Sequence, residues 1–321
     1  MIIRYRKRPL PLQKIDALIS RLPENHPKMS MLRREAAKQQ KGYNGERKLD
    51  YYIETMSDDY SIIQDTCFRL HGKQVQIDSL LVSSHAIFVV EVKSMEGVVV
   101  LDTTLRQCYR EIEGEIERYK YPITQVEMIQ SNLLRFLQLA NLHGLPVYYL
   151  VAFSERSTYL HVKGEEGNLK KVITFVEDVP LKIAKINDQL IHKNPHPKNH
   201  PLRNKIVQYI MNHCEEFDID IFDKYKINKN EILSGVHCPE CNHLGMERKF
   251  KYWYCHTCSK KSKNAHEKSL KEYQLLYENH ITNLECRQFL HINSRHTTKY
   301  LLQKTPYITK HNRLKWVIQH T

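Results

Sequence analysis

The sequence predicts an α/β fold in which helices flank a mixed β-sheet, with a small cysteine-rich module and a helical segment after it. Three observations support this prediction. Helical and strand patterns alternate between residues 41 and 180, two Cys-x-x-Cys pairs lie between residues 238 and 258, and a helical pattern resumes after them. With this order of elements, helices packed on both faces of a mixed sheet would bury the apolar sides of the helices and strands.

Hydrophobic periodicity places the individual elements. Helical spacing of apolar residues predicts helices at residues 30–40, 44–56 and 125–142. Runs of β-branched and aromatic residues predict strands at residues 61–70, 75–82, 86–93, 97–102, 147–153 and 172–176. Residues 191–205 are rich in proline and histidine, and we interpret them as a linker rather than a metal site because proline-rich spacing fixes no ligand geometry.

A chain of 321 residues exceeds what one average core needs. We expect a basic N-terminal segment (1–40), a main domain (41–180), a helical or linker region (181–235), a cysteine module (236–262) and a C-terminal module (263–321). P-loop and dinucleotide glycine motifs are absent, which argues against nucleotide-driven chemistry. No apolar run could cross a bilayer and no secretory apolar region follows the basic start, so we expect a soluble, cytoplasmic protein without a membrane partner.

Charge is distributed unevenly along the chain. Residues 1–40 carry 10 Lys and Arg against 3 Asp and Glu, residues 41–237 carry 24 against 27, and residues 238–321 carry 15 against 6. Because Lys and Arg release counterions from phosphates, the basic ends fit a polyanion-binding protein. A well-solvated surface is the plainer interpretation of the same charges.

Four of the cysteines form two pairs, Cys238 with Cys241 and Cys255 with Cys258, and 13 residues separate the pairs. This spacing is typical of zinc sites, and since protein fills all four positions the Zn²⁺ would be structural. Disulfides or a redox pair are the competing interpretations. The aromatic run at residues 252–254 either packs the core of a zinc ribbon or stacks on bases.

The strands at residues 75–82 and 86–93 form a hairpin around a short polar break. Glu91 and Lys93 share one face of the second strand, and Asp78 lies about as far before the turn as Glu91 lies after it, so we expect the two carboxylates to meet. Such a pair favours a hard divalent cation, Mg²⁺ or Mn²⁺, suited to phosphodiester hydrolysis, and Lys93 would hold the attacking water or stabilise developing charge. A surface ion pair at a strand end is the alternative.

Two helical positions add to this candidate site. Glu46 falls on the buried stripe of the helix at residues 44–56, where it could complete the metal shell or complement the helix dipole. Gln125 falls in the first turn of the next helix, beside free backbone N–H groups that attract anions such as phosphate.

In this order, the residues resemble the NERD (nuclease-related) domain family, which is related to the PD-(D/E)xK superfamily of restriction-endonuclease-like folds. The motifs are Gly42-x-x-Gly45-Glu46, Ile77-Asp78, Glu91-x-Lys93 followed by Gly97, and Pro122-x-x-Gln125. The resemblance implies a restriction-endonuclease-like mixed sheet and assigns metal-binding and catalytic roles to Asp78, Glu91 and Lys93. It makes Glu46 a helix-borne acid and Gln125 a helix-borne polar contact.

The sequence of the C-terminal module predicts a helix-turn-helix. Residues 282–285 match the pattern of a capping box at the start of one helix, and we expect a second helix from Ser294. In this motif the second helix enters the major groove, and the residues that would contact bases or phosphates are Arg295, His296, Thr298 and Lys299. We therefore expect a metal-dependent nuclease acting on DNA, with RNA as the other candidate substrate. The alternative is a non-catalytic DNA-binding protein that retains the nuclease-like fold; the sequence indicates no oligomeric state.

Overall fold

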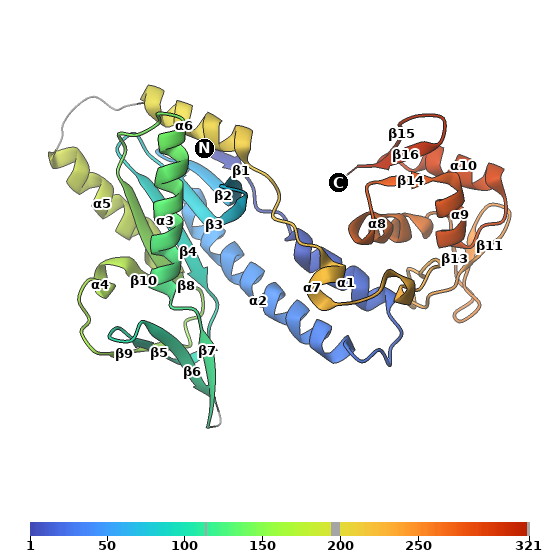
Figure 1. Ribbon diagram of the computed structural model, residues 1–321, viewed down its shortest axis with the longest axis horizontal. Coiled ribbons are helices and arrows are strands. Elements are labelled where there is room, and N and C mark those ends of the chain that lie inside the picture. The colour runs from blue at the N-terminus through green and yellow to red at the C-terminus, as the bar shows by residue number, and fades with distance from the viewer. Residues whose placement is uncertain (113, 194–199, 320–321) are drawn as a thin grey trace. The chain divides into compact units, whose positions relative to one another are not determined.

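The computed structural model describes residues 1–112, 114–193 and 200–319. The chain forms two compact units (Figure 1). Unit 1 contains residues 1–9 and 38–217, and unit 2 contains residues 10–37 and 218–321. The boundary after residue 37 falls inside helix α2 (Met29–Ile53). Among the described residues, no helix combines the length and the apolar character that crossing a membrane requires.

The core of unit 1 is a six-stranded sheet in the order β1-β2-β3-β4-β8-β10. Its strands are β1 (Ile2–Arg4), β2 (Ser61–Leu70), β3 (Lys73–Val82), β4 (Ile87–Lys93), β8 (Val147–Phe153) and β10 (Ile173–Phe175). The pairs β2–β3 and β3–β4 are antiparallel, whereas β1–β2, β4–β8 and β8–β10 are parallel. The mixed sheet that the sequence predicts is therefore confirmed.

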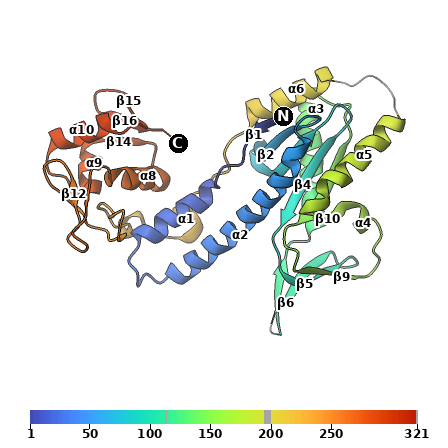
Figure 2. The same cartoon turned by 180° about the vertical axis from the view of Figure 1, so that it is seen from behind.

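Helices cover both faces of this sheet (Figures 1 and 2). On one face α3 (Pro122–Leu139) packs in a buried cluster with Val89 of β4. On the other face α5 (Val179–Lys193) and the end of α2 pack with Val90. Since side chains alternate along a strand, consecutive residues of β4 are buried on opposite faces, which explains why the strand reads as one continuous apolar run.

A second, four-stranded sheet completes unit 1 in the order β7-β6-β5-β9. Its strands are β5 (Gly97–Asp102), β6 (Gln107–Ile112), β7 (Glu115–Tyr119) and β9 (Thr158–Lys163). The remaining helices of the unit are α4 (Leu169–Val172), α6 (His200–His213) and the 3₁₀ turns η1 (Glu54–Met56) and η2 (Val176–Asp178).

Two features differ from the sequence predictions. The helices expected at residues 30–40 and 44–56 are one continuous helix, α2, because packing offsets the cost of about 1 kcal/mol that each interior glycine adds. The linker expected at residues 191–205 is partly helical, since α5 runs to Lys193 and α6 begins at His200, with Pro201 in the first turn where proline is tolerated. Residues 194–199 of that prediction lie outside the described residues.

Unit 2 combines N-terminal helices, a small ribbon and a helix–sheet module. The N-terminal part packs α1 (Leu10–Arg21) and the start of α2 against α7 (Ile221–Tyr225), with η3 (Lys229–Glu231) following. The ribbon strands are β11 (Glu247–Arg248), β12 (Trp253–Tyr254) and β13 (Lys261–Ser262). The module comprises α8 (His266–Leu276), β14 (His280–Thr282), α9 (Asn283–Leu290), α10 (Arg295–Lys304), β15 (Ile308–Lys310) and β16 (Lys315–Ile318), with sheet order β14-β16-β15.

A buried ion pair joins α1 to α8 within unit 2. The Arg21 side chain is 0% exposed, and its guanidinium group lies 2.7 Å from the Glu272 carboxylate. Arg21 also donates to the carbonyl oxygen of Leu233 at 2.9 Å and lies over the ring of Phe289. These contacts connect α1, near the start of the sequence, with residues 233–289 in the interior of unit 2.

The environment of His266 predicts a loss of stability at acidic pH. The Trp253 Nε1–H group donates to His266 Nδ1 at 3.2 Å, and burial lowers the pKa of His266 from 6.5 to about 4. Below the ordinary pKa the unfolded chain binds a proton that the folded chain does not. We expect the free energy of unfolding of unit 2 to fall by about 3 kcal/mol as the pH drops from about 6.5 to about 4.

Tryptophan fluorescence during urea unfolding measures this loss, because the two tryptophans of the chain, Trp253 and Trp316, both lie in unit 2. Zn²⁺ is kept in excess at every pH. His266→Gln is the matched variant, since its amide oxygen can still accept from Trp253 but does not titrate. Wild type should lose stability relative to this variant as the pH falls, and parallel pH profiles would contradict the prediction.

Candidate functional site

Asp78 and Glu91 lie opposite each other where β3 and β4 separate. The last paired residues of the two strands are Ser79 and Val90, so the next position along places Asp78 and Glu91 on the same side of the sheet. Beyond this point β4 continues beside β8, and the Val92 N–H group donates to Asp78 Oδ2 at 2.7 Å. A side-chain hydrogen bond thus holds the Asp78 carboxylate against β4.

Glu91, Lys93 and Gln125 form a closed triangle of hydrogen bonds. Lys93 Nζ lies 2.7 Å from Glu91 Oε1 and donates to Gln125 Oε1 at 2.9 Å. The Gln125 amide donates to the same Glu91 oxygen. The side chains of Glu91 and Lys93 are 5% and 15% exposed, so this pair is largely removed from water and is not the surface ion pair of the alternative interpretation.

Arg6 connects the N-terminal segment to this site. Its side chain is 2% exposed and lies 2.6 Å from Glu46 Oε2 and 2.7 Å from Asp50 Oδ2, and it also donates to the backbone oxygen of Asp78 at 2.6 Å. The pairing of β1 with β2 brings the segment to this place. Glu46 is therefore held by Arg6 and not by the Glu91 triangle. Sequence reasoning missed Arg6 because one arginine in a basic stretch carries no distinguishing signal.

Burial and mutual repulsion raise the pKa values of these acids. Burial, followed by the charge of Asp78, raises the pKa of Glu46 to about 9 and that of Glu91 to about 7. Burial also raises the pKa of Asp78, while Lys93 opposes the shift. Burial therefore disfavours the charged forms of these acids more than Arg6 and Lys93 stabilise them, and an added cation would stabilise the ionised acids.

Gly45 determines how closely α2 approaches the site. A Cβ atom at this position would lie 1.7 Å from Ser94 Oγ and 2.5 Å from Ser154 Oγ, and these two hydroxyl groups hydrogen-bond at 2.8 Å. Glycine is the residue that permits such close backbone approach. The next residue along the helix is Glu46, so this contact also brings the Glu46 carboxylate toward the acids of the hairpin.

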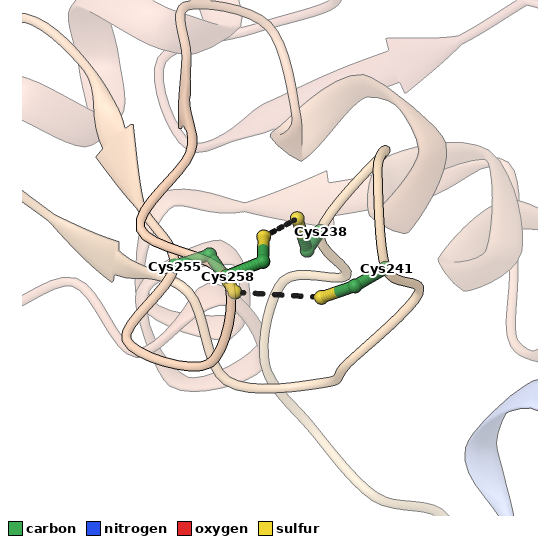
Figure 3. Close-up of side chains that lie close together, drawn as sticks. All are labelled: Cys238, Cys241, Cys255 and Cys258. Atoms are coloured by element: carbon green, nitrogen blue, oxygen red, sulfur yellow. Dashed lines mark hydrogen bonds between the residues drawn. The ribbon is translucent and has the colours of Figure 1, made fainter.

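The four cysteines of the ribbon gather in one cluster (Figure 3). The Sγ atoms are 3.6 Å apart in the pair Cys238 and Cys258 and also in the pair Cys241 and Cys255, and all four lie within 4.8 Å of one another. Two sulfurs bound at about 2.3 Å to a tetrahedral Zn²⁺ are about 3.8 Å apart, whereas bonded disulfide sulfurs are about 2.05 Å apart. The donor set therefore fits a structural Zn²⁺ and not disulfides.

The ligand atoms of the cysteine cluster lie closer together than the carboxylates of the acidic site. In the described ranges of the chain, the four cysteines are the group of three or more potential ligands whose donor atoms all lie within 4.8 Å. The acids at the hairpin do not form such a compact group, and the Glu46 carboxylate points toward Arg6. In the aromatic run of the ribbon, Trp253 is fully buried, which confirms the core-packing interpretation for this residue.

The helices α9 and α10 begin at the residues that the capping signals indicate. Thr282 and Glu285 form a reciprocal capping box at the start of α9. Ser294 caps α10 by accepting from the Thr297 N–H group. Between the helices, His291 adopts the left-handed conformation, with φ of 57°.

The predicted contact residues of α10 do not share one environment. Arg295, His296 and Lys299 are exposed. Thr298 is fully buried, and its hydroxyl group donates to a backbone oxygen four residues earlier at 3.1 Å. Thr298 therefore packs α10 against the rest of unit 2 and presents no group to a ligand, whereas Tyr300, which the sequence analysis did not single out, is 56% exposed.

Comparison with known proteins assigns the first part of the chain. Residues 41–154 match the family model of the nuclease-related domain, NERD. No curated protein and no solved structure matches the chain. The matched segment contains all five residues that the sequence analysis places in the acidic site, and it excludes Arg6. The chain thus carries a nuclease-related domain at residues 41–154, followed later in the sequence by a four-cysteine cluster that fits a zinc ribbon.

Proposed function

We propose that the nuclease-related domain hydrolyses DNA phosphodiester bonds with a divalent cation and that unit 2 binds the DNA. One observation carries the proposal: Asp78 and Glu91 lie opposite each other on adjacent strands, and the pKa values of both are raised. Lys93 lies beside them and is held by hydrogen bonds to Glu91 and Gln125. Carboxyl groups with perturbed pKa values at a largely buried site are typical of catalytic centres.

Asp78 and Glu91 are the residues that would hold the cation. Carboxylate oxygens are the ligands that Mg²⁺ and Mn²⁺ prefer, and Mg²⁺ commonly binds through one or two carboxylates and keeps several waters. When bound, such a cation supplies Lewis-acid stabilisation of negative charge on the phosphate. Glu46, held by Arg6, lies near the pair on α2 and would add negative charge there once it is ionised.

Lys93 retains one donor for a reacting group. Its ammonium group has three N–H donors, and two of them are directed at Glu91 and Gln125. The third can donate to a water or to a phosphate oxygen and would stabilise charge that develops there. Gln125 positions this ammonium group, because it accepts from Lys93 while it donates to Glu91.

A non-catalytic DNA-binding function is the second candidate, and Arg6 is the observation that favours it. Arg6 pairs with Glu46 and Asp50 from within the protein, so the fold can hold these two acids without a metal. The cleavage experiment separates the two functions.

Cleavage should depend on Asp78 and Lys93. With plasmid and single-stranded DNA as substrates, and RNA in parallel, we expect Asp78→Ala and Lys93→Met to lower the Mg²⁺- or Mn²⁺-dependent rate by at least about 100-fold. Lys73→Met, at an exposed lysine of β3, should leave the rate unchanged. EDTA should stop cleavage and excess Mg²⁺ should restore it. Equal residual cleavage in all variants would favour the non-catalytic function.

We further propose that α10 contacts the DNA, because its exposed Arg295 and Lys299 belong to a segment with 15 basic and 6 acidic residues. Arg295→Ala/Lys299→Ala should weaken binding and reduce the slope of log affinity against log salt by about 2. Lys73→Ala/Lys205→Ala, two exposed lysines of unit 1, is the control. Anisotropy of a labelled duplex without Mg²⁺ gives both slopes, and an unchanged slope in the α10 variant would remove this role.

A further inference from the structure

Unit 1 also contains a lysine-rich cavity that shares no residue with the acidic site. The cavity has a volume of about 760 Å³, and its lining residues come from the first half of β8 and from α3, α4 and α5. Its lining includes five lysines, which are Lys170, Lys171, Lys182, Lys185 and Lys193. None of the described residues that line it is acidic.

The sheet topology produces this cavity. β10 pairs only with residues 151–153 of β8, so in the described structure the earlier part of β8 has no strand on that side. Helix α5 passes there, and Lys182, Lys185 and Lys193 recur at a spacing that places them on one face of the helix. Gln130 of α3 also lines the cavity, and its side-chain amide donates to the Val147 carbonyl oxygen.

Part of the positive charge in this cavity has no partner of opposite charge. Lys182 is committed to the fold, since its Nζ donates to the backbone oxygens of Lys170 and Ile173 at 2.8 and 2.7 Å. Lys170 pairs with Glu166. Among the described residues, no carboxylate forms an ion pair with Lys171 or Lys185. Lys171 and Lys185 are exposed where they line the cavity, so both ammonium groups are accessible to an anion bound there.

The same cavity offers apolar surface. Tyr148, Ile186 and Leu190 belong to its lining, and the Tyr148 ring is fixed by stacking on Phe88 with centroids 5.7 Å apart. The volume falls in the range of small-molecule sites. A ligand that combines several negative charges with a ring system matches both parts of the lining.

We propose that this cavity binds a phosphate-bearing ligand of nucleotide size, with the phosphates at Lys171 and Lys185. The chain lacks a glycine-rich phosphate loop, so lysine side chains and not backbone N–H groups would recognise the phosphates. The inference does not depend on nuclease activity, because it uses none of the residues assigned to catalysis.

Calorimetric titration of the full chain with ATP, without Mg²⁺, tests the proposal. Lys171→Glu/Lys185→Glu is compared with Lys73→Glu/Lys205→Glu, which changes the net charge equally at exposed positions outside the cavity. ATP should bind wild type and the control with the same affinity and the cavity variant at least about tenfold more weakly. Adenosine, which has no phosphate, should not bind. Equal thermal unfolding of the two variants shows that both are folded.

A short single-stranded oligonucleotide identifies the source of the phosphates. If it displaces ATP from wild type, the cavity takes phosphates of a nucleic-acid chain; if it does not, the ligand is a free nucleotide. Equal ATP affinity in the cavity variant and the control overturns the proposal. So does the absence of any ATP or oligonucleotide binding that depends on Lys171 and Lys185. Cleavage assays on the cavity variant report separately on the proposed nuclease function.

Discussion

Cys255→Ser should abolish stoichiometric Zn²⁺ binding and unfold the ribbon of unit 2. Metal binding of this kind supplies roughly 10–16 kcal/mol toward folding, far more than three strands of two residues each could provide by themselves. A backbone N–H group of Cys258 lowers the pKa of Cys255 to about 6, so its thiolate is available near neutral pH. Wild type should contain about one Zn²⁺ per chain by elemental analysis.

The matched control is Cys214→Ser, a half-buried cysteine of unit 1 that is remote from the cluster in sequence. It should keep its Zn²⁺ and its tryptophan fluorescence. In Cys255→Ser, the buried Trp253 should become exposed and its emission should shift to longer wavelength. A variant that retains both Zn²⁺ and a buried Trp253 would show that these sulfurs do not hold the metal.

Arg6→Met should destabilise unit 1 by about 3–5 kcal/mol. The substitution keeps much of the side-chain volume but leaves Glu46 and Asp50 without the cation that now pairs with both. Hydrogen exchange of peptides from β2, β3 and β4 measures the effect on unit 1 by itself. Adding Glu46→Gln and Asp50→Asn should recover part of the loss, because the buried charges are then removed together.

Arg8→Met serves as the comparison, since Arg8 donates to Gln40 at an exposed position. Its effect should stay within about 0.5 kcal/mol, as is usual for surface changes. If exchange in β2 to β4 is the same in Arg6→Met and Arg8→Met, Arg6 has no role in holding the acids.

The strands and the acid pair could be predicted because their causes are local. Runs of β-branched and aromatic residues favour strands, and the strands predicted from them at residues 61–70, 97–102 and 147–153 coincide with β2, β5 and β8. The register of a hairpin can be counted from its turn. Asp78 and Glu91 are about equally far from the turn in sequence, so the sequence predicts that they lie opposite each other.

The rest depended on contacts between distant parts of the sequence. Arg6 meets Glu46 across 40 residues, and no feature of the surrounding residues marks it. The burial of Thr298 was detectable in principle, since it precedes Leu301 and Leu302 at helical spacing and so shares their apolar face. The continuity of α2 was hidden by two glycines, one of which serves close packing.

The path of the chain has a consequence for biosynthesis. Helix α1 leaves the ribosome about 200 residues before α7, whose Ile221 and Tyr225 help to bury its apolar side. At translation rates of about 5–20 residues per second, this interval lasts roughly 10–40 s. During that time the nuclease-related domain can complete its own core while the amphipathic helix α1 lacks its contacts with α7 and α8, so a nascent chain stalled before residue 221 should be a preferred substrate for chaperones.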